Sequence, residues 1–182
     1  MVTERFISRL PVGITEEGVK TGGLILKATG ADGVTIKNLT IVGTANTERA
    51  INVIQKAATL VIEEVTAEGF KYTLNVAASS VGSNITVNGG KLSGYAAVNI
   101  TGDNSTLVVN EAELVGVNDY PKADSNAFAV ISIGDETTSE TTDNVSVTVN
   151  GGKLTSISTN GNRQFAVAVK AVTEAAVKVD AE

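Results

Sequence analysis

The chain has 182 residues, of which 42% are hydrophobic and only 4% aromatic, and it contains no cysteine, histidine or tryptophan. This length suits one domain whose core is built from Val, Ile, Leu and Ala. The formal net charge of -6 and the absence of clustered Lys or Arg argue against a nucleic-acid partner or insertion at an anionic membrane. The lack of cysteine excludes disulfides, zinc-thiolate sites and cysteine nucleophiles.

Residues 1–22 are expected to form an N-terminal cap or lead-in. Phe6, Ile7 and Leu10 recur at helical spacing before Pro11, which favours a short amphipathic capping helix over Thr3 to Leu10. The first 30 residues contain no basic segment followed by an apolar one, and no apolar run is long enough to span a bilayer. We therefore expect either a cytosolic chain or a secreted one whose signal peptide is not present in this sequence.

One segment recurs along the rest of the chain with its apolar positions in register. Its copies, the last of them truncated, begin at Val34, Leu60, Ile85, Leu107, Val147 and Val177. The spacings of 26, 25, 22, 40 and 30 residues fall mostly in the range that indicates a solenoid. Within a copy the alternation of apolar residues slips by one, as between Ile36 and Leu39, which indicates a corner between two short strands.

A second set of apolar strands lies between the copies of this segment. Its members are Ile51-Asn-Val53, Leu74-Asn-Val76, Val98-Asn-Ile100, Ile131-Ser-Ile133 and Val167-Ala-Val169. Each turn of the predicted solenoid therefore carries about three short strands, as in a coil with three faces.

Parallel stacking predicts which residues touch, because adjacent turns lie about 4.8 Å apart and equivalent residues become neighbours. Two inward columns are aliphatic: Ile36, Ile62, Val87, Val109, Val149 and Val179, and Ile41, Ala67, Leu92, Leu114 and Leu154. Two outward columns are polar: Lys37, Glu63, Asn88, Asn110, Asn150 and Asp180, and Thr40, Thr66, Lys91, Glu113 and Lys153. We interpret the polar columns as solvated ladders in which opposite charges attract weakly.

Three asparagines share another strand position. Asn52, Asn75 and Asn99 lie between apolar residues, so they are expected to face outward as a short asparagine ladder; a sugar-binding row is the alternative. The pairs Gly89-Gly90 and Gly151-Gly152 lack the spacing of a phosphate-binding loop and no helix follows them. We interpret each pair as a coil corner that needs a positive φ or close backbone approach.

The stretch from Ala50 to Phe70 carries a family resemblance. Its pattern Ala-Ile-x-Val, a short loop and a second alternating strand resembles the repeat of the right-handed parallel β-helices of the pectate-lyase-like (pectin-lyase-fold) superfamily, and glycines 43, 69, 94 and 116 strengthen the likeness. The resemblance runs from about Leu24 to the C-terminus. It implies an all-β, single-stranded right-handed parallel β-helix of about six turns, with residues 1–182 as one domain and the coils over 23–182.

The catalytic groups of that superfamily are not evident here. Its pectate-cleaving members resemble one another in acidic residues that bind calcium and in an Arg or Lys that abstracts a proton. Its hydrolases resemble one another in paired Asp residues and a His. This chain has four arginines, of which Arg49 follows Glu48 in a turn, and no column places aspartates in successive turns. We therefore expect no enzyme, with a calcium-assisted polysaccharide lyase or glycoside hydrolase as the alternative.

The segment that produces the irregular 40-residue spacing is a better candidate for a binding site than the regular coils. Polar insertions at 117–126 and 134–144 are expected to bulge as loops, and loops of solenoids often gather on the binding face. The candidates for stacking a sugar or binding a cation are Asp119, Tyr120, Asp124 and Asn126. Weaker candidates for binding calcium are Asp135, Glu136 and Asp143.

These observations favour a non-catalytic module of a bacterial cell-surface or secreted protein. It would act as a spacer or adhesion scaffold, with weak contact to a cell-wall or host glycan and no required cofactor other than, in one alternative, calcium. A phage tailspike or assembly segment is a further alternative. The open edges of a solenoid also predict end-to-end self-association or further domains of a longer chain, and acidic residues that blunt the C-terminal edge are the alternative.

Overall fold

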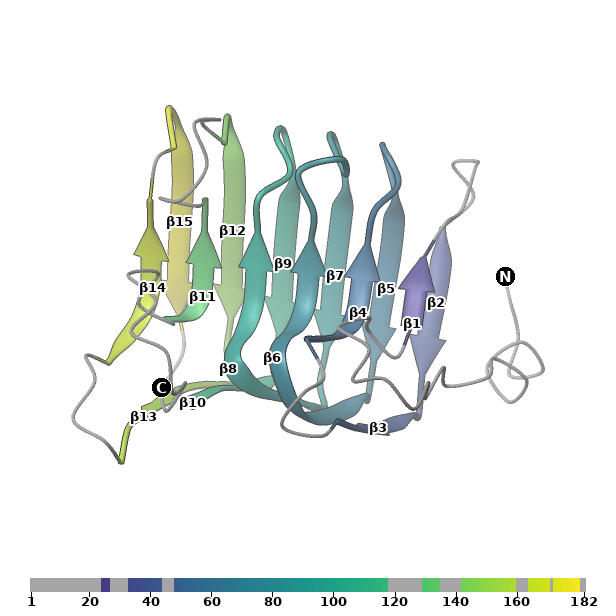
Figure 1. The fold of residues 1–182 in the computed structure, drawn as a ribbon, viewed down its shortest axis with the longest axis vertical. Coiled ribbons are helices and arrows are strands. Elements are labelled where there is room, and N and C mark those ends of the chain that lie inside the picture. Colours follow the sequence, from purple (N-terminus) through teal and green to yellow (C-terminus); the bar gives the residue numbers. More distant parts are fainter. Residues whose placement is uncertain are drawn as a thin grey trace.

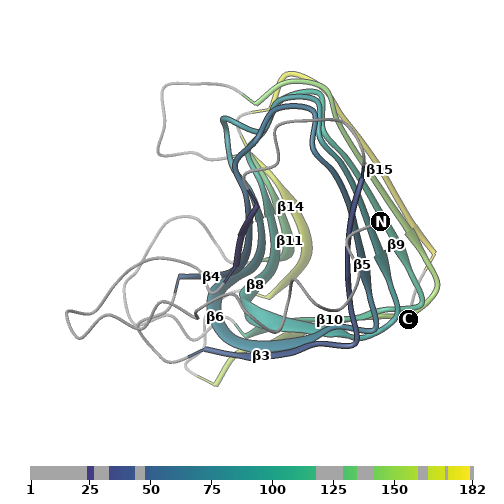
Figure 2. The same cartoon turned by 90° about the vertical axis from the view of Figure 1, so that its right-hand side faces the viewer.

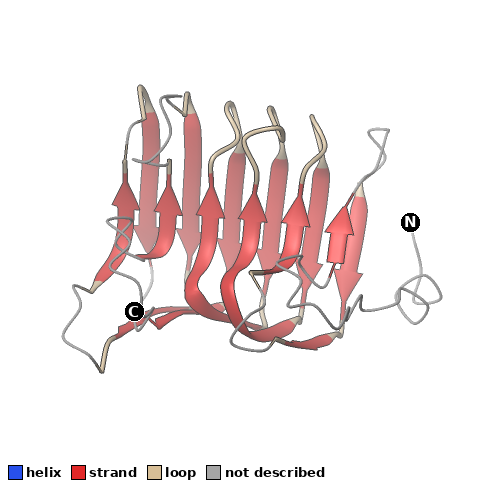
Figure 3. Cartoon of the chain, in the orientation of Figure 1, coloured by secondary structure: helices blue, strands red, loops and turns tan. Residues whose placement is uncertain are grey.

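The computed structural model describes most of the repeat region. The described residues are 24–26, 33–43, 48–117, 129–134, 142–159, 164–170 and 172–180. They form an all-β structure in which every strand pairs with its neighbours in parallel, and they contain no helix that could cross a membrane. Figure 3 shows these strands and the loops that join them. The expected capping helix over Thr3 to Leu10 lies outside the described residues.

The copies of the repeated segment form one parallel sheet of six strands. These strands are β2 (Val34–Lys37), β5 (Thr59–Glu63), β7 (Asn84–Asn88), β9 (Thr106–Asn110), β12 (Val145–Asn150) and β15 (Ala175–Asp180). They lie side by side in chain order, so each copy pairs with the next (Figure 1). The parallel direction requires the chain to return between copies, and the second sheet contains the strands of that return.

The second sheet has nine strands and covers two faces of the structure. Its strands are β1 (Leu24–Leu26), β3 (Thr40–Val42), β4 (Arg49–Val53), β6 (Thr66–Val76), β8 (Lys91–Ile100), β10 (Glu113–Val117), β11 (Ala129–Ile133), β13 (Lys153–Ile157) and β14 (Phe165–Val169). Strands β6 and β8 bend sharply, so the sheet turns a corner and the cross-section is triangular (Figure 2). Two of the three short strands expected per turn are therefore one long bent strand in these coils.

The predicted aliphatic columns are confirmed. In the six-stranded sheet, each residue of the column from Ile36 to Val179 is the direct partner of the next. The column from Ile41 to Leu154 is likewise continuous through the second sheet. Ile62, Val87 and Val109 are completely buried, and each such side chain contributes about 1.5–3 kcal/mol to folding.

The corner after each of the first five strands of the six-stranded sheet has a left-handed residue, and these residues stack in a column. Its members, with φ between 50° and 70°, are Asn38, Glu64, Gly89, Glu111 and Gly151. The backbone N–H of each residue donates to a carbonyl of the following coil. A Cβ at Gly89 would lie 2.2 Å from Glu64 Oε1, and one at Gly151 would lie 2.3 Å from Glu111 Oε1. Glutamate and glycine therefore alternate because each glutamate side chain occupies the space above a glycine.

The second glycine of each pair meets backbone rather than a side chain. A Cβ at Gly90 would lie 2.3 Å from the carbonyl oxygen of Val65, and one at Gly152 would lie 2.3 Å from that of Ala112. Both glycines also have φ above 70°. The interpretation of these pairs as corners is confirmed, and both reasons for glycine apply together.

The expected glycine column is only partly continuous. Gly94 pairs with Gly116, but its partner in the preceding coil is Phe70, because the register shifts just before that residue. Gly43 and Gly69 form a separate close contact, in which a Cβ at Gly43 would lie 2.6 Å from the Gly69 carbonyl oxygen. A β-bulge therefore displaces the column by one residue between the second and third coils.

The corner geometry predicts a difference between two Gly→Ala substitutions. Gly82 and Gly90 have nearly the same φ, 75° and 74°, but no atom lies within 4 Å of a Cβ at Gly82. Both substitutions should lower the free energy of unfolding by about 1–2 kcal/mol, because alanine is strained in the left-handed conformation. Gly90→Ala should lower the free energy of unfolding by a further ~1–3 kcal/mol, measured by urea denaturation, because Val65 obstructs the added methyl group. Equal losses for the two variants would contradict this account of the corner.

Candidate functional site

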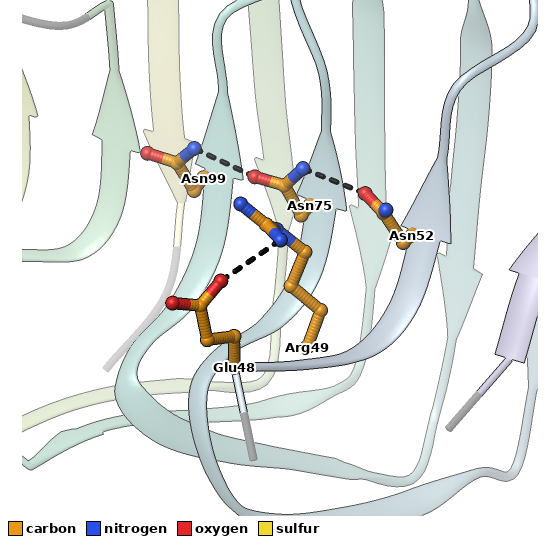
Figure 4. A network of polar contacts seen from close by, with 5 residues as sticks. All are labelled: Glu48, Arg49, Asn52, Asn75 and Asn99. Carbon is orange, nitrogen blue, oxygen red and sulfur yellow. Dashed lines mark hydrogen bonds and ion pairs between the residues drawn. The ribbon is translucent and has the colours of Figure 1, made fainter. Parts of the chain in front are cut away.

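The outer face of β4, β6 and β8 carries the asparagine ladder. Asn52, Asn75 and Asn99 are register partners, and Ser132 of β11 continues the row. The Nδ2 atom of Asn75 donates to Asn52 Oδ1 at 2.8 Å, and Asn99 Nδ2 donates to Asn75 Oδ1 at 2.8 Å (Figure 4). The prediction of a ladder at these positions is confirmed.

This ladder is more buried than an outward-facing row was expected to be. Asn75 is 4% exposed and Asn99 is 8% exposed, whereas Asn52 is half-buried. Burying an amide costs free energy unless its donor and acceptor are hydrogen bonded, and the central amide uses one of each within the row. The row is therefore a structural ladder that leaves only Asn52 substantially accessible to a sugar.

Arg49 and Glu48 lie on the same face at the start of β4 (Figure 4). The Nη1 atom of Arg49 lies 3.0 Å from Glu48 Oε2, and the two side chains are 30% and 28% exposed. The Nε atom of Arg49 is buried and makes no hydrogen bond. A carboxylate already engages the guanidinium. The pair is therefore less suited than a free arginine to bind an anion or to abstract a proton from a substrate.

The residues predicted to bind a sugar or calcium fall mostly beyond the described part of the chain. Asp119, Tyr120, Asp124, Asn126, Asp135 and Glu136 all lie outside the described residues. Asp143 is described: its N–H donates to Asp103 Oδ1 at 2.9 Å, and its Oδ1 accepts a hydrogen bond from Thr173 Oγ1. Asp143 thus links adjacent coils in a turn.

Acidic residues do not gather into a metal-binding group in the parts of the chain that the structure describes. Nowhere there do three or more His, Cys, Asp or Glu side chains come together to hold a metal ion. The calcium and carbohydrate sites remain predictions, because six of their seven residues lie in segments without a description.

The polar columns at the exposed corners follow the predicted register. Asn110 Nδ2 donates to Asn88 Oδ1 at 2.8 Å, and Asn150 Nδ2 donates to Asn110 Oδ1 at 3.0 Å. In the neighbouring column, Lys91 Nζ lies 2.9 Å from Glu113 Oε1, with both side chains 42% exposed. Such an exposed ion pair contributes about 0–1 kcal/mol, so it adds little to stability.

One buried polar cluster was not predicted from the sequence. Ser80, Ser83 and Ser105 are almost completely buried at a corner before the six-stranded sheet. Ser80 Oγ donates to the carbonyl of Gln55 at 3.1 Å, while Ser83 Oγ and Ser105 Oγ donate to the carbonyl of Ser80 at 2.9 Å and 3.3 Å. The available signal was that Ser83 and Ser105 occupy the same position of successive copies. These hydroxyls satisfy loop carbonyls and therefore have a structural role.

Comparisons of this chain with family models, with curated proteins and with solved structures find no match.

The two asparagine ladders predict different costs for the same substitution. Asn75→Ala leaves the buried Asn99 amide without its acceptor, so it should lower the free energy of unfolding by about 2–3 kcal/mol. Asn110→Ala breaks two equivalent hydrogen bonds in a more exposed ladder, where water replaces the lost partner. It should lower the free energy of unfolding by less than about 1 kcal/mol. Chemical denaturation of both variants measures the difference. A cost for Asn110→Ala equal to or above that for Asn75→Ala would refute the distinction between the ladders.

Proposed function

We propose that this chain is a non-catalytic module of a bacterial cell-surface or secreted protein. In this proposal it is a right-handed parallel β-helix of about six turns, and it acts as a stiff spacer or display scaffold. The observation that supports it most is the unbroken pairing of the six-stranded sheet from β2 to β15. Bending the axis of such a stack would separate hydrogen-bonded neighbours along a whole face.

The polar columns support the scaffold proposal from the outside of the structure. The outward amides of Asn88, Asn110 and Asn150 bond to one another, as do those of the buried ladder. Each central amide spends one donor and one acceptor on its neighbours, so less of its hydrogen-bonding capacity remains for a ligand. A regular face of this kind favours support over recognition.

Membership of the pectate-lyase-like superfamily is part of the proposal. The parallel sheets, the triangular cross-section and the aliphatic columns agree with it, and the resemblance around Ala50 to Phe70 motivates it. Because that fold carries both enzymes and non-catalytic modules, specificity depends on the loops. We propose weak glycan contact in the 117–126 insertion. Tyr120 would stack on a sugar ring, and Asp124 would accept hydrogen bonds from the sugar hydroxyls.

A glycan array run with and without calcium, together with a cleavage assay on acidic polysaccharides, tests this proposal. We expect no cleavage in either condition and weak binding to a subset of glycans. Changing Tyr120→Ala and Asp124→Ala together should abolish that binding, while Thr86→Ala, on the outer face of the six-stranded sheet, should leave it unchanged. Calcium-dependent cleavage would instead establish the lyase or hydrolase alternative, and a stable trimer in light scattering would favour the tailspike alternative.

Stiffness has its own test in native-state hydrogen exchange. Strands β7 and β9 each lie between two hydrogen-bonded neighbours, so their amides should exchange only through global unfolding. Their exchange free energies should therefore equal the unfolding free energy from urea denaturation within about 1 kcal/mol. Exchange of β7 or β9 amides well below that value would show local opening in the middle of the stack and argue against a stiff spacer.

A further inference from the structure

The outer face of the six-stranded sheet has a patch without charge over β7, β9 and β12. Outward side chains alternate with buried ones along each of these strands, and the outward ones are Asn84, Thr86, Asn88, Thr106, Val108, Asn110, Ser146, Thr148 and Asn150. None of them is charged, although the chain contains 14 Lys and Arg and 20 Asp and Glu residues. The flanking strands of the same sheet carry charges on this face, at Lys37, Glu63, Lys178 and Asp180. The charge-free patch therefore lies in the middle of the stack.

The central outward column of this face consists of β-branched residues. Its members, each the register partner of the next, are Thr35, Val61, Thr86, Val108 and Thr148. All of them are half-buried. Because β-branching restricts χ1, these side chains hold their methyl groups in positions that repeat about every 4.8 Å along the stack. The column is therefore a row of fixed methyl groups with a threonine hydroxyl in every second coil.

The patch is also flat. Neighbouring strands of a sheet ordinarily twist by about 20–25°, and side-chain ladders are one device that keeps a sheet untwisted. Here the strands from β2 to β12 run nearly parallel (Figure 1), and the amide ladder of Asn88, Asn110 and Asn150 follows one edge of the patch. Outward residues of one strand lie about 6.6 Å apart, since each residue rises about 3.3 Å. The outward side chains thus form a nearly planar, repeating grid.

The chemistry of the patch does not suit a macromolecular ligand. Protein interfaces concentrate binding energy in Trp, Tyr and Arg, sugar sites use aromatic side chains, and nucleic acids require Lys or Arg. None of these residue types occurs among the outward residues of β7, β9 and β12. The amides of the ladder also spend donors and acceptors on one another. The ligand that fits is neutral, planar and repeating, and it needs fixed positions more than free hydrogen-bonding groups.

We propose that this patch binds ice. Water in contact with methyl groups loses orientational freedom, and hydroxyl groups such as that of Thr86 hydrogen-bond to it. A fixed grid of both groups holds its first-shell waters in a repeating array, and this array joins the surface of an ice crystal. A charged side chain would keep its own hydration shell and interrupt the array, so the absence of Lys, Arg, Asp and Glu from the patch is part of the design. This activity goes beyond the role of a spacer.

Thermal hysteresis of the full chain, the gap between the melting and freezing points of a single ice crystal, tests the proposal. We expect the wild-type chain to produce a gap and to facet the crystal. Val108→Lys places a charge at the centre of the patch and should abolish both effects, whereas Val108→Thr keeps a β-branched side chain and should retain them. Val42→Lys makes the same change in β3 of the other sheet, where Val42 is 67% exposed, and should behave as wild type.

Several outcomes would overturn ice binding at this patch. They are the absence of a gap in the wild-type chain, a gap that Val108→Lys retains, and an equal loss in Val108→Lys and Val42→Lys, which would indicate a general effect of added charge. Absence of a gap together with binding to crystalline cellulose that Val108→Lys abolishes would assign the patch to a neutral glycan instead. Circular dichroism establishes that each variant is folded.

Adsorption to ice gives a second readout that does not depend on the rate of crystal growth. The chain contains no cysteine, so Val42→Cys allows one fluorophore to be attached away from the patch. The labelled chain should collect on the surface of a growing ice crystal, whereas the labelled chain that also carries Val108→Lys should be excluded into the liquid. Exclusion of both labelled chains, or adsorption of both, contradicts the proposed site.

Discussion

Parallel stacking in register is the constraint on which the rest of this structure depends. Coils about 4.8 Å apart make each residue the neighbour of its own equivalent, so a column must be uniform or complementary. Val87 and Val109 satisfy this requirement with matching shapes, and Lys91 and Glu113 satisfy it with opposite charges. Whether a residue fits its position therefore depends on the equivalent residues of the coils on either side of it.

The alternation of glutamate and glycine at the corners follows from the same constraint. Each of the five described corners has a left-handed residue at this point, but two glutamates in succession would compete for the same space. Glu64 is followed by Gly89, and Glu111 by Gly151, so each carboxylate lies over a residue without a side chain. The residue allowed at a corner of one coil thus depends on the residue at the same corner of the next coil.

The repeat made the columns predictable, whereas burial and bending depended on information outside it. Alternation alone was sufficient to pair Ile36 with Ile62 and Asn88 with Asn110, because parallel stacking admits one simple register. It did not indicate that Asn75 and Asn99 would be buried, since alternation specifies the face on which a side chain lies but not how much of that face is accessible. The same limit applies to Ser83, whose small polar side chain is typical of an exposed loop. The predicted loop site around Tyr120 remains a prediction, because long insertions have no repeat partner to position them.

Nuclear Overhauser effects between adjacent coils test the stacking most directly. The pair Val109 and Val149 is the most demanding, because 40 residues of sequence separate two residues that the structure makes direct neighbours. Stacking in register requires backbone effects between these two residues in the pattern of a parallel sheet, and equivalent effects between Val87 and Val109. Effects that pair Val109 in an antiparallel pattern, or with a residue one position away from Val149, would contradict it.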